Sequence, residues 1–219
     1  MRAVVLREIG ALEVQERPAP TPESAEVLIR VAATGICGSD VHGYTGENGR
    51  RFPGQIMGHE SVGYIESVGA DVDPAAFPTG AVVTFNPVVV PAADVAEFAG
   101  REQHHPGKIV IGVAPDRQAA FADYVAVPAR NVVLLPEGMP VVYGALVEPL
   151  AVAVHAVRRA LADGDRRALV IGGGPIGQSV VLALRMHGVT AIALSEPDAG
   201  RRALCERLGA RTIDPLAGP

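Results

Sequence analysis

Several residue types are scarce in this chain of 219 residues. It contains no tryptophan, only 4% of its residues are aromatic, and it has two cysteines. Cys37 and Cys205 lie far apart in the sequence, so they do not predict the disulfide framework of a small secreted protein, and a reducing cytoplasm is the expected compartment. The first ten residues, MRAVVLREIG, lack the long apolar core of a signal peptide.

Basic clusters and long apolar runs are also missing. The net charge is −5 and the pI is about 5.7, and no basic stripe predicts nucleic acid as a partner. We find no run of about 18 apolar residues, so no segment is expected to span a membrane. With 48% hydrophobic and 20% charged residues, the composition is that of a globular protein with one large domain or two small ones.

Residues 1–140 are predicted to form a β-rich domain. Short runs of Val and Ile alternate with Gly, Pro and Asp, which is typical of many short strands joined by turns in a barrel or sandwich. The expected strands are residues 2–6, 26–32, 61–68, 81–86, 121–128 and 132–135.

Residues 141–219 are predicted to form a second domain, in which strands and helices alternate. A helix is expected over residues 143–161. It is followed by strands at 167–171, 191–194 and 211–213, with helices at 178–187 and 200–208 between them. This β-α-β-α-β order predicts the first half of a doubly wound parallel sheet, so the fold class is α/β with a β-rich N-terminal domain.

A glycine-rich segment, VIGGGPIG at residues 170–177, joins the first of these strands to its helix. In such a G-x-G-x-x-G turn the glycines permit the tight turn, close approach of a pyrophosphate and close helix packing, and the helix N-terminus binds the phosphates. An acid about 20 residues later can hold the ribose hydroxyls, which favours NAD over NADP, although two arginines follow it closely. The alternative is a glycine-rich turn with a surface glutamate. The residues expected to bind the coenzyme are Gly172, Gly174, Pro175, Ile176, Gly177 and Glu196.

Two other dense clusters, GICGSDVH at residues 35–42 and GHE at residues 58–60, lie in the predicted β-rich domain. Cys37 and His59 are ligand types that suit Zn²⁺. Taken alone, they are equally well explained as a small buried apolar residue and part of a turn.

Together with EPL at residues 148–150 and the glycine turn, these clusters occur in the order and approximate spacing of the zinc-dependent medium-chain dehydrogenases. The sequence resembles the sorbitol, butanediol and threonine dehydrogenase branch over essentially its whole length. The resemblance implies a domain like the GroES co-chaperonin, followed by a partial Rossmann domain. It also implies reversible oxidation of a small secondary alcohol or polyol with catalytic zinc and NAD(P), NAD being favoured over NADP.

The resemblance also implies roles for individual residues. Cys37, His59 and Glu148 would be zinc ligands, and Glu60 a carboxylate that can enter or leave the zinc shell. The family's proton relay is matched by Ser39 and His42, with the histidine at the solvent end. The Asp of the first cluster, Asp40, is expected either to support a zinc-bound histidine or to cap a turn.

The chain departs from the family in one lobe, residues 88–108. Many relatives hold a second, structural zinc there with four cysteines, whereas this segment has none. In an ungapped alignment the four positions hold Pro91, Asp94, Glu97 and His105, so we predict that the structural zinc is absent and that one catalytic zinc remains. The alternative is that the last three still bind a metal.

The second departure concerns length. Relatives continue beyond the last residues of this sequence, so the resemblance suggests a chain that stops within its coenzyme domain and leaves an unpaired apolar sheet edge. A full-length parent is expected to form a homodimer or homotetramer. Two alternatives remain: a non-catalytic or inactive fragment, and a zinc-free quinone or enone reductase of the same superfamily, which predicts a broken ligand pattern.

Overall fold

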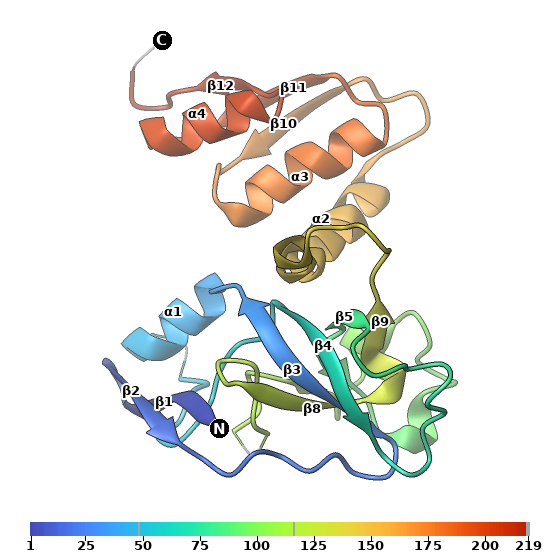
Figure 1. Cartoon of the computed structure of the whole chain (residues 1–219). Coiled ribbons are helices and arrows are strands. Elements are labelled where there is room, and N and C mark those ends of the chain that lie inside the picture. The colour runs from blue at the N-terminus through green and yellow to red at the C-terminus, as the bar shows by residue number, and fades with distance from the viewer. Residues whose placement is uncertain (48, 116, 218–219) are drawn as a thin grey trace. The chain divides into compact units, whose positions relative to one another are not determined.

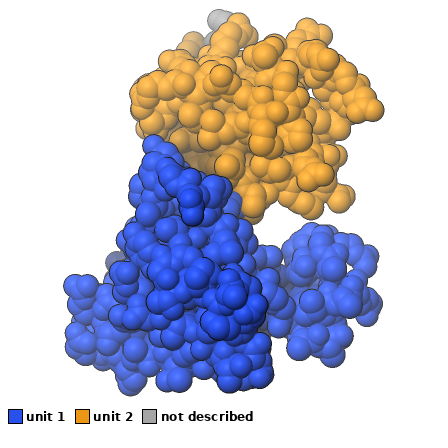
Figure 2. Space-filling view, turned by 45° about the vertical axis from the view of Figure 1, so that its right-hand side comes forward, with its two compact units in different colours: residues 1–148 blue, residues 149–219 orange. Residues whose placement is uncertain are grey.

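The computed structural model describes residues 1–47, 49–115 and 117–217, and the chain divides into two compact units. Unit 1 comprises residues 1–148 and unit 2 comprises residues 149–219, as the two colours of Figure 2 show. The sequence placed the boundary after residue 140, within the stretch that leads into the long helix of this region. Each unit is described by itself.

Unit 1 is built from antiparallel strands (Figure 1). Its strands are β1 (Arg2–Glu8), β2 (Ala11–Glu16), β3 (Glu26–Thr34), β4 (Ser61–Val68), β5 (Val82–Phe85), β6 (Val88–Val89), β7 (Ile109–Val110), β8 (Tyr124–Pro128) and β9 (Val132–Leu134). The main sheet has the order β8-β3-β4-β5-β9, while β1-β2 and β6-β7 form separate two-stranded sheets. This confirms the predicted β-rich N-terminal domain, although the sequence did not predict β2, β6 or β7.

The core of unit 1 lies against one face of the main sheet. Val27 and Ile29 of β3 and Val125 and Val127 of β8 are all at most 1% exposed. Side chains two apart along a strand point to the same face, so these two pairs contribute to one continuous apolar layer. That packed layer provides the rigid support for the loops at the strand ends.

A short helix, α1 (Gly38–Thr45), follows β3 after a three-residue connection. Its N-cap is Cys37, and the Asp40 carboxylate accepts the Cys37 backbone N–H at 3.1 Å. Gly46 ends the helix in the left-handed conformation, at φ +81°. The sequence predicted no helix here.

Unit 2 contains a three-stranded parallel sheet in the order β10-β11-β12 (Figure 1). Its elements are β10 (Arg167–Ile171), α3 (Pro175–Met186), β11 (Ala191–Ser195), α4 (Ala199–Arg207) and β12 (Arg211–Ile213). The helix α2 (Val147–Ala160) leads into this unit and is preceded by the 3-10 segment Val141–Leu146. The predicted β-α-β-α-β order and the parallel sheet are confirmed.

One face of this parallel sheet is covered and the other is bare. Val170, Ile192 and Leu194 are buried in a cluster with residues of α2, α3 and α4. On β10 the alternate residues Leu169 and Ile171 are 63% and 83% exposed. Parallel sheets are normally covered on both faces, so this face is unusually apolar for one in contact with water.

The segment Val141–Ala160 is, by length and composition, apolar enough to cross a membrane, and it is the one such segment in the described part of the chain. Its mean hydropathy is 1.4, and about a quarter of it is buried. The stretch is interrupted by Glu148, His155, Arg158 and Arg159, so it is not an unbroken run of about 18 apolar residues. One such helix is a weak indication, because core helices of soluble proteins pass the same test.

Candidate functional site

Three of the predicted metal ligands converge in unit 1. Cys37, His59 and Glu60 each offer one ligand atom, and these atoms lie within 4.8 Å of one another. The pairing of β3 with β4 explains why residues far apart in sequence meet, because Thr34 pairs with Ser61 at the ends of the two strands. Cys37 lies three residues after the end of β3, and His59 and Glu60 lie just before the start of β4.

Two contacts hold the Glu60 side of this cluster in place. The Gly35 N–H donates to the Glu60 backbone carbonyl at 2.7 Å. A Cβ atom at Gly35 would lie 2.4 Å from Glu60 Oε2, so only glycine leaves room for the carboxylate at this position. The cluster is thus fixed by backbone geometry as well as by its ligand residues.

Glu148, the fourth predicted ligand, is outside that group of three but close enough to interact with it. Burial raises the pKa of the Glu148 carboxyl, the charge of His59 lowers it, and the Glu60 carboxylate raises it again. Burial likewise raises the pKa of the Cys37 thiol, against hydrogen bonds from Ser39 that lower it. One thiol, one imidazole and two carboxyl groups are a donor set that suits Zn²⁺. The positive charge of the metal would stabilise the thiolate and the carboxylates, the ionised forms that burial disfavours.

The two predicted relay residues lie on α1. Ser39 follows the N-cap Cys37 by two residues, and its proximity to the thiol acts to lower the pKa of Cys37. His42 is exposed, and its Nδ1 lies 3.0 Å from Glu47 Oε2. The helix therefore places Ser39 beside the predicted metal ligands and His42 in contact with solvent, and their roles in proton transfer stay a prediction.

Asp40 forms the cap that the sequence allowed, and it also lies near His59, so its support of a zinc-bound histidine stays a prediction. Its Oδ2 accepts the Cys37 N–H and so caps the helix, while its Oδ1 lies 3.8 Å from His59 Nδ1. The same oxygen lies 3.5 Å from Nη2 of Arg51, a residue that sequence reasoning missed. A polar loop gives no signal that one of its arginines is buried.

The lobe that lacks cysteines is held by a contact between two of the substituted positions. His105 Nε2 lies 2.9 Å from Asp94 Oδ2, and His105 Nδ1 accepts the Gly107 N–H at 2.9 Å. The ring also packs edge-on against Phe98, with centroids 4.5 Å apart. Within the described ranges, only the Cys37 group has three or more residues placed to share a metal ion, so the alternative of a metal held by Asp94, Glu97 and His105 finds no support in the geometry.

In unit 2 the glycine turn has the geometry that its sequence pattern requires. Gly172 adopts φ +95°, and its N–H donates to the Ser195 carbonyl at 2.8 Å. A Cβ at Gly177 would lie 1.9 Å from the Gly172 carbonyl oxygen, whereas a Cβ at Gly174 would meet open space. Gly174 is the N-cap of α3, Pro175 is its first residue, and Ile176 is 47% exposed. The turn thus leaves the helix N-terminus open to a ligand.

Glu196 follows β11 and braces this turn. Its buried carboxylate accepts the Gly173 N–H at 2.7 Å and the Asp198 N–H at 2.8 Å. These bonds, to Asp198 first and then Gly173, lower the pKa of the Glu196 carboxyl. Each carboxylate oxygen has a second lone pair, so the group can still accept from a sugar hydroxyl. Gln178, which the sequence analysis missed, donates to the Gly173 carbonyl at 2.8 Å.

The two arginines after Glu196 have different surroundings. Arg202 donates to the Glu196 carbonyl at 2.8 Å and pairs with Asp214 at 3.0 Å. Arg201 is exposed at the start of α4, and its charge acts on Glu196 by lowering the pKa of that carboxyl. Arg201 is therefore the arginine that remains available to an anionic ligand.

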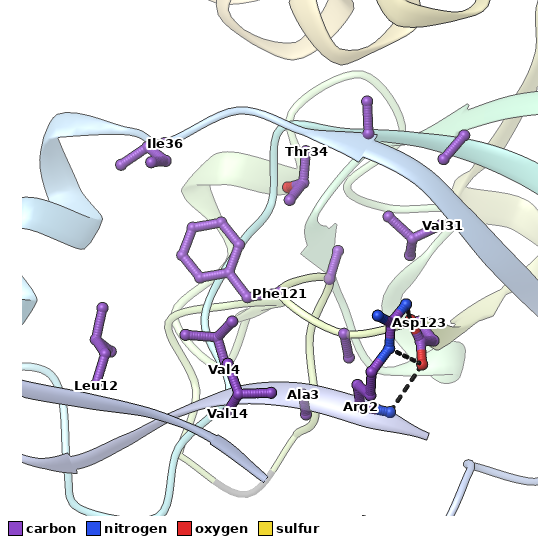
Figure 3. Close-up of a pocket in the computed structure, with 14 residues that line it drawn as sticks. Arg2, Ala3, Val4, Leu12, Val14, Val31, Thr34, Ile36, Phe121 and Asp123 are labelled. Carbon is purple, nitrogen blue, oxygen red and sulfur yellow. Dashed lines mark hydrogen bonds and ion pairs between the residues drawn. The ribbon is translucent and has the colours of Figure 1, made fainter. Parts of the chain in front are cut away.

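Unit 1 also contains an apolar pocket of about 500 Å³ (Figure 3). Val4, Leu12, Val31 and Phe121 are among the residues that line it, and an ion pair between Arg2 and Asp123 at 3.1 Å lies at its edge. None of the predicted ligand, relay or coenzyme residues lines this pocket. It is therefore separate from the candidate metal site.

Comparisons with known proteins agree with this arrangement. The alcohol dehydrogenase GroES-like domain family matches residues 23–137. Sorbitol dehydrogenase of Gallus gallus is 34% identical over 95% of this chain and 59% of that protein. A structure assigned as a zinc-binding dehydrogenase of Sinorhizobium meliloti 1021, bound to NADP, has a TM-score of 0.89 at 34% identity and covers 99% of this chain and 62% of its own.

A further solved structure, 2R,3R-butanediol dehydrogenase from Bacillus subtilis, has a TM-score of 0.86 at 31% identity, over 99% of this chain and 64% of its own. The chain spans about 60% of the length of the proteins it matches. Because the domain family covers more than half of the sequence and the same fold extends through both units, this chain belongs to the zinc-type medium-chain alcohol dehydrogenase family.

Proposed function

We propose that this protein is a zinc-dependent oxidoreductase that transfers hydride between a secondary alcohol or polyol and NAD(P). The observation that carries the proposal is the convergence of Cys37, His59 and Glu60, with their ligand atoms within 4.8 Å, in a member of this family. The open glycine turn before α3 supports a dinucleotide as the second ligand.

Cys37, His59 and Glu148 are proposed to hold the metal, with Glu60 beside them. When bound, zinc supplies Lewis-acid polarisation that makes an alcohol hydroxyl easier to ionise near neutral pH. Ser39 would take up the proton at its Oγ, and His42 would pass it to solvent, which its exposed position supports.

The coenzyme is proposed to bind at the glycine turn. Backbone N–H groups at the start of α3 would bind the pyrophosphate, and Glu196 would accept hydrogen bonds from the ribose hydroxyls. A carboxylate there favours NAD over NADP, because it repels a 2′-phosphate. The exposed Arg201 and the NADP bound to the Sinorhizobium meliloti relative favour NADP instead, and titration with both coenzymes decides between them.

The substrate class rests on the relatives. Sorbitol dehydrogenase and 2R,3R-butanediol dehydrogenase act, by their names, on alcohols that carry several hydroxyl groups. A carboxylate in the metal shell in place of a second thiolate agrees with that branch. We also propose that the protein acts as a homodimer or homotetramer.

The direct test is the zinc content of purified protein, compared with that of a Glu148→Ala variant. We expect about one zinc per chain, reduced in the variant, because a catalytic site has three protein ligands. Titration with NAD and NADP then measures the coenzyme preference, and assays with secondary alcohols measure turnover.

The outcomes separate the alternatives. A well-folded protein without zinc would favour a zinc-free reductase, although the intact ligand cluster argues against it. Zinc and coenzyme binding without oxidation of any secondary alcohol would favour a non-catalytic role. Two zinc ions per chain would mean that the lobe binds metal after all.

A further inference from the structure

Arg51 is the only arginine or lysine that is buried among the residues the structure describes, with a side chain 1% exposed. Moving a guanidinium group out of water costs several kcal/mol unless an anion and hydrogen bonds compensate it. A buried arginine therefore requires a partner, and the identity of that partner indicates its role.

The partner is Asp40, whose side chain is 2% exposed and whose Oδ1 lies 3.5 Å from Arg51 Nη2. Arg51 Nη1 donates to the Arg50 carbonyl at 3.3 Å. The helix α1 makes room for the arginine, since a Cβ at Gly43 would lie 2.2 Å from Arg51 Cγ. Gly43 lies three residues after Asp40, so the gap and the carboxylate occupy the same face of α1.

Asp40 in turn contacts two predicted metal ligands. One oxygen accepts the Cys37 N–H at 3.1 Å, and the other lies 3.8 Å from His59 Nδ1. That nitrogen is buried and has no hydrogen-bond partner among the described residues. A histidine that binds a metal through one nitrogen almost always donates its other N–H to a carboxylate, a carbonyl or water. Asp40 is the carboxylate placed for this bond.

We propose that Arg51 is a positioning residue for the metal site and acts through Asp40. Its guanidinium group holds the Asp40 carboxylate between α1 and His59, so that one side chain fixes both the Cys37 backbone and the His59 ring. The inference rests on the proposed function, because it assumes that Cys37 and His59 bind zinc.

Two effects of Arg51 on zinc affinity have opposite signs. Loss of the arginine releases Asp40, and the loss of such outer partners typically weakens metal binding about 10–100-fold. Loss of a nearby positive charge would instead strengthen the binding of a cation. We expect orientation to dominate, because both contacts of Asp40 with the predicted ligands, to the Cys37 N–H and toward His59 Nδ1, depend on where its carboxylate is held.

The test is a zinc titration of the metal-free full chain against a chromophoric chelator. We compare the parent with Arg51→Met, Arg51→Lys, Asp40→Asn and the double variant Arg51→Met/Asp40→Asn, and Arg101→Met removes an exposed arginine of the same unit as a control. We expect Arg51→Met and Asp40→Asn each to weaken zinc affinity about 10–100-fold. The double variant should bind no more weakly than Asp40→Asn, because the arginine acts through the aspartate.

The visible spectrum of bound Co²⁺ provides a readout that a merely structural role would not change. We expect the band positions to shift in Arg51→Met and to return toward the parent in Arg51→Lys, which keeps the charge. If Arg51→Met does not fold, Arg51→Gln takes its place, because it also removes the charge but keeps a polar side chain. Parent-like zinc affinity and Co²⁺ spectrum in Arg51→Gln would overturn the proposal.

Unchanged or tighter zinc binding by Arg51→Met, with only a lower unfolding temperature, would also overturn the inference and leave Arg51 a structural residue. Additive losses in the double variant would show that Arg51 does not act through Asp40. A parent chain that binds no zinc would instead overturn the proposed function, and the inference with it.

Discussion

Unit 1 contains two pairs that each consist of one aspartate and one histidine, but the two pairs differ in geometry. Asp40 and His59 lie 3.8 Å apart, and Asp94 and His105 lie 2.9 Å apart. Both histidines are buried, at 6% and 7% exposure. By resemblance to the family, His59 marks a catalytic zinc site and His105 the position of a structural zinc ligand.

The difference between the pairs lies in what remains unpaired. His105 has partners at both ring nitrogens and an aromatic neighbour, so it already has the contacts that a buried histidine requires. His59 has an unpartnered Nδ1 and two further ligand types, Cys37 and Glu60, close by. A metal site therefore requires several donor atoms that converge and that have no hydrogen-bond partners within the protein. Residue types that suit a metal are not sufficient by themselves.

The largest expected effect comes from replacing the thiol of Cys37 in the candidate metal site. Cys37→Ser should lower zinc affinity by more than about 100-fold, beyond the loss typical of outer partners, because it removes a direct thiolate ligand. Zinc competition titration measures the change. Cys205→Ser removes the other thiol, in unit 2, and should keep the parent zinc content; equal losses in the two variants would contradict the assignment.

The Asp94–His105 pair should contribute to the stability of the fold and not to zinc binding. His105→Ala removes a buried hydrogen-bonded ring, so we expect the free energy of unfolding to fall by about 1–3 kcal/mol with zinc content unchanged. Urea denaturation and limited proteolysis of residues 88–108 measure the effect. The neighbouring exposed His104→Ala is the matched control, and a loss of zinc in His105→Ala alone would show that the lobe is a metal site.

Glu196, like His105, is a buried polar side chain that already has hydrogen-bond partners, in this case two backbone N–H groups. Its pKa is lower in the folded state than the value of about 4.3 for an unfolded chain, so its contribution to stability is present above that pH. That contribution is lost as pH falls through the lower, folded value. Glu196→Gln should therefore lower stability at pH 7 and flatten the loss of stability in acid, as measured by denaturation at several pH values.

An exposed carboxylate, Glu137, gives the control for this pH dependence. Glu137→Gln should leave the profile of stability against pH close to that of the parent. If Glu196→Gln has the parent profile as well, the hydrogen bonds from Gly173 and Asp198 do not stabilise the fold.

The smallest effect is expected at His42, which is exposed and contacts Glu47. His42→Gln should change the free energy of unfolding by no more than about 0.5 kcal/mol and leave zinc affinity unchanged. Thermal unfolding and the zinc titration check this. A marked loss of zinc would place His42 among the groups that build the metal site, contrary to its exposed position.

The sequence predicted the strands and helices of unit 2 with small differences at their ends, because apolar periodicity and glycine punctuation are strong there. It missed α1, whose eight residues include two glycines and no apolar repeat. That helix forms through its Asp40 cap and through the close packing of Gly43 on Arg51, and such contacts leave no local pattern. Arg51 and Gln178 were missed for the same reason, since loop and helix-surface positions do not show which polar side chains are buried.

The sequence by itself determined the order of the elements in unit 2, the glycine turn and the residue types at the candidate ligand positions. These follow from backbone propensities and short-range spacing, which are written along the chain. The tertiary structure alone decided that Thr34 pairs with Ser61, which brings Cys37 to His59, and that His105 is closed by Asp94 while His59 is not. Those outcomes depend on contacts between distant segments, and these exist only once the core has packed and fixed the register of the strands.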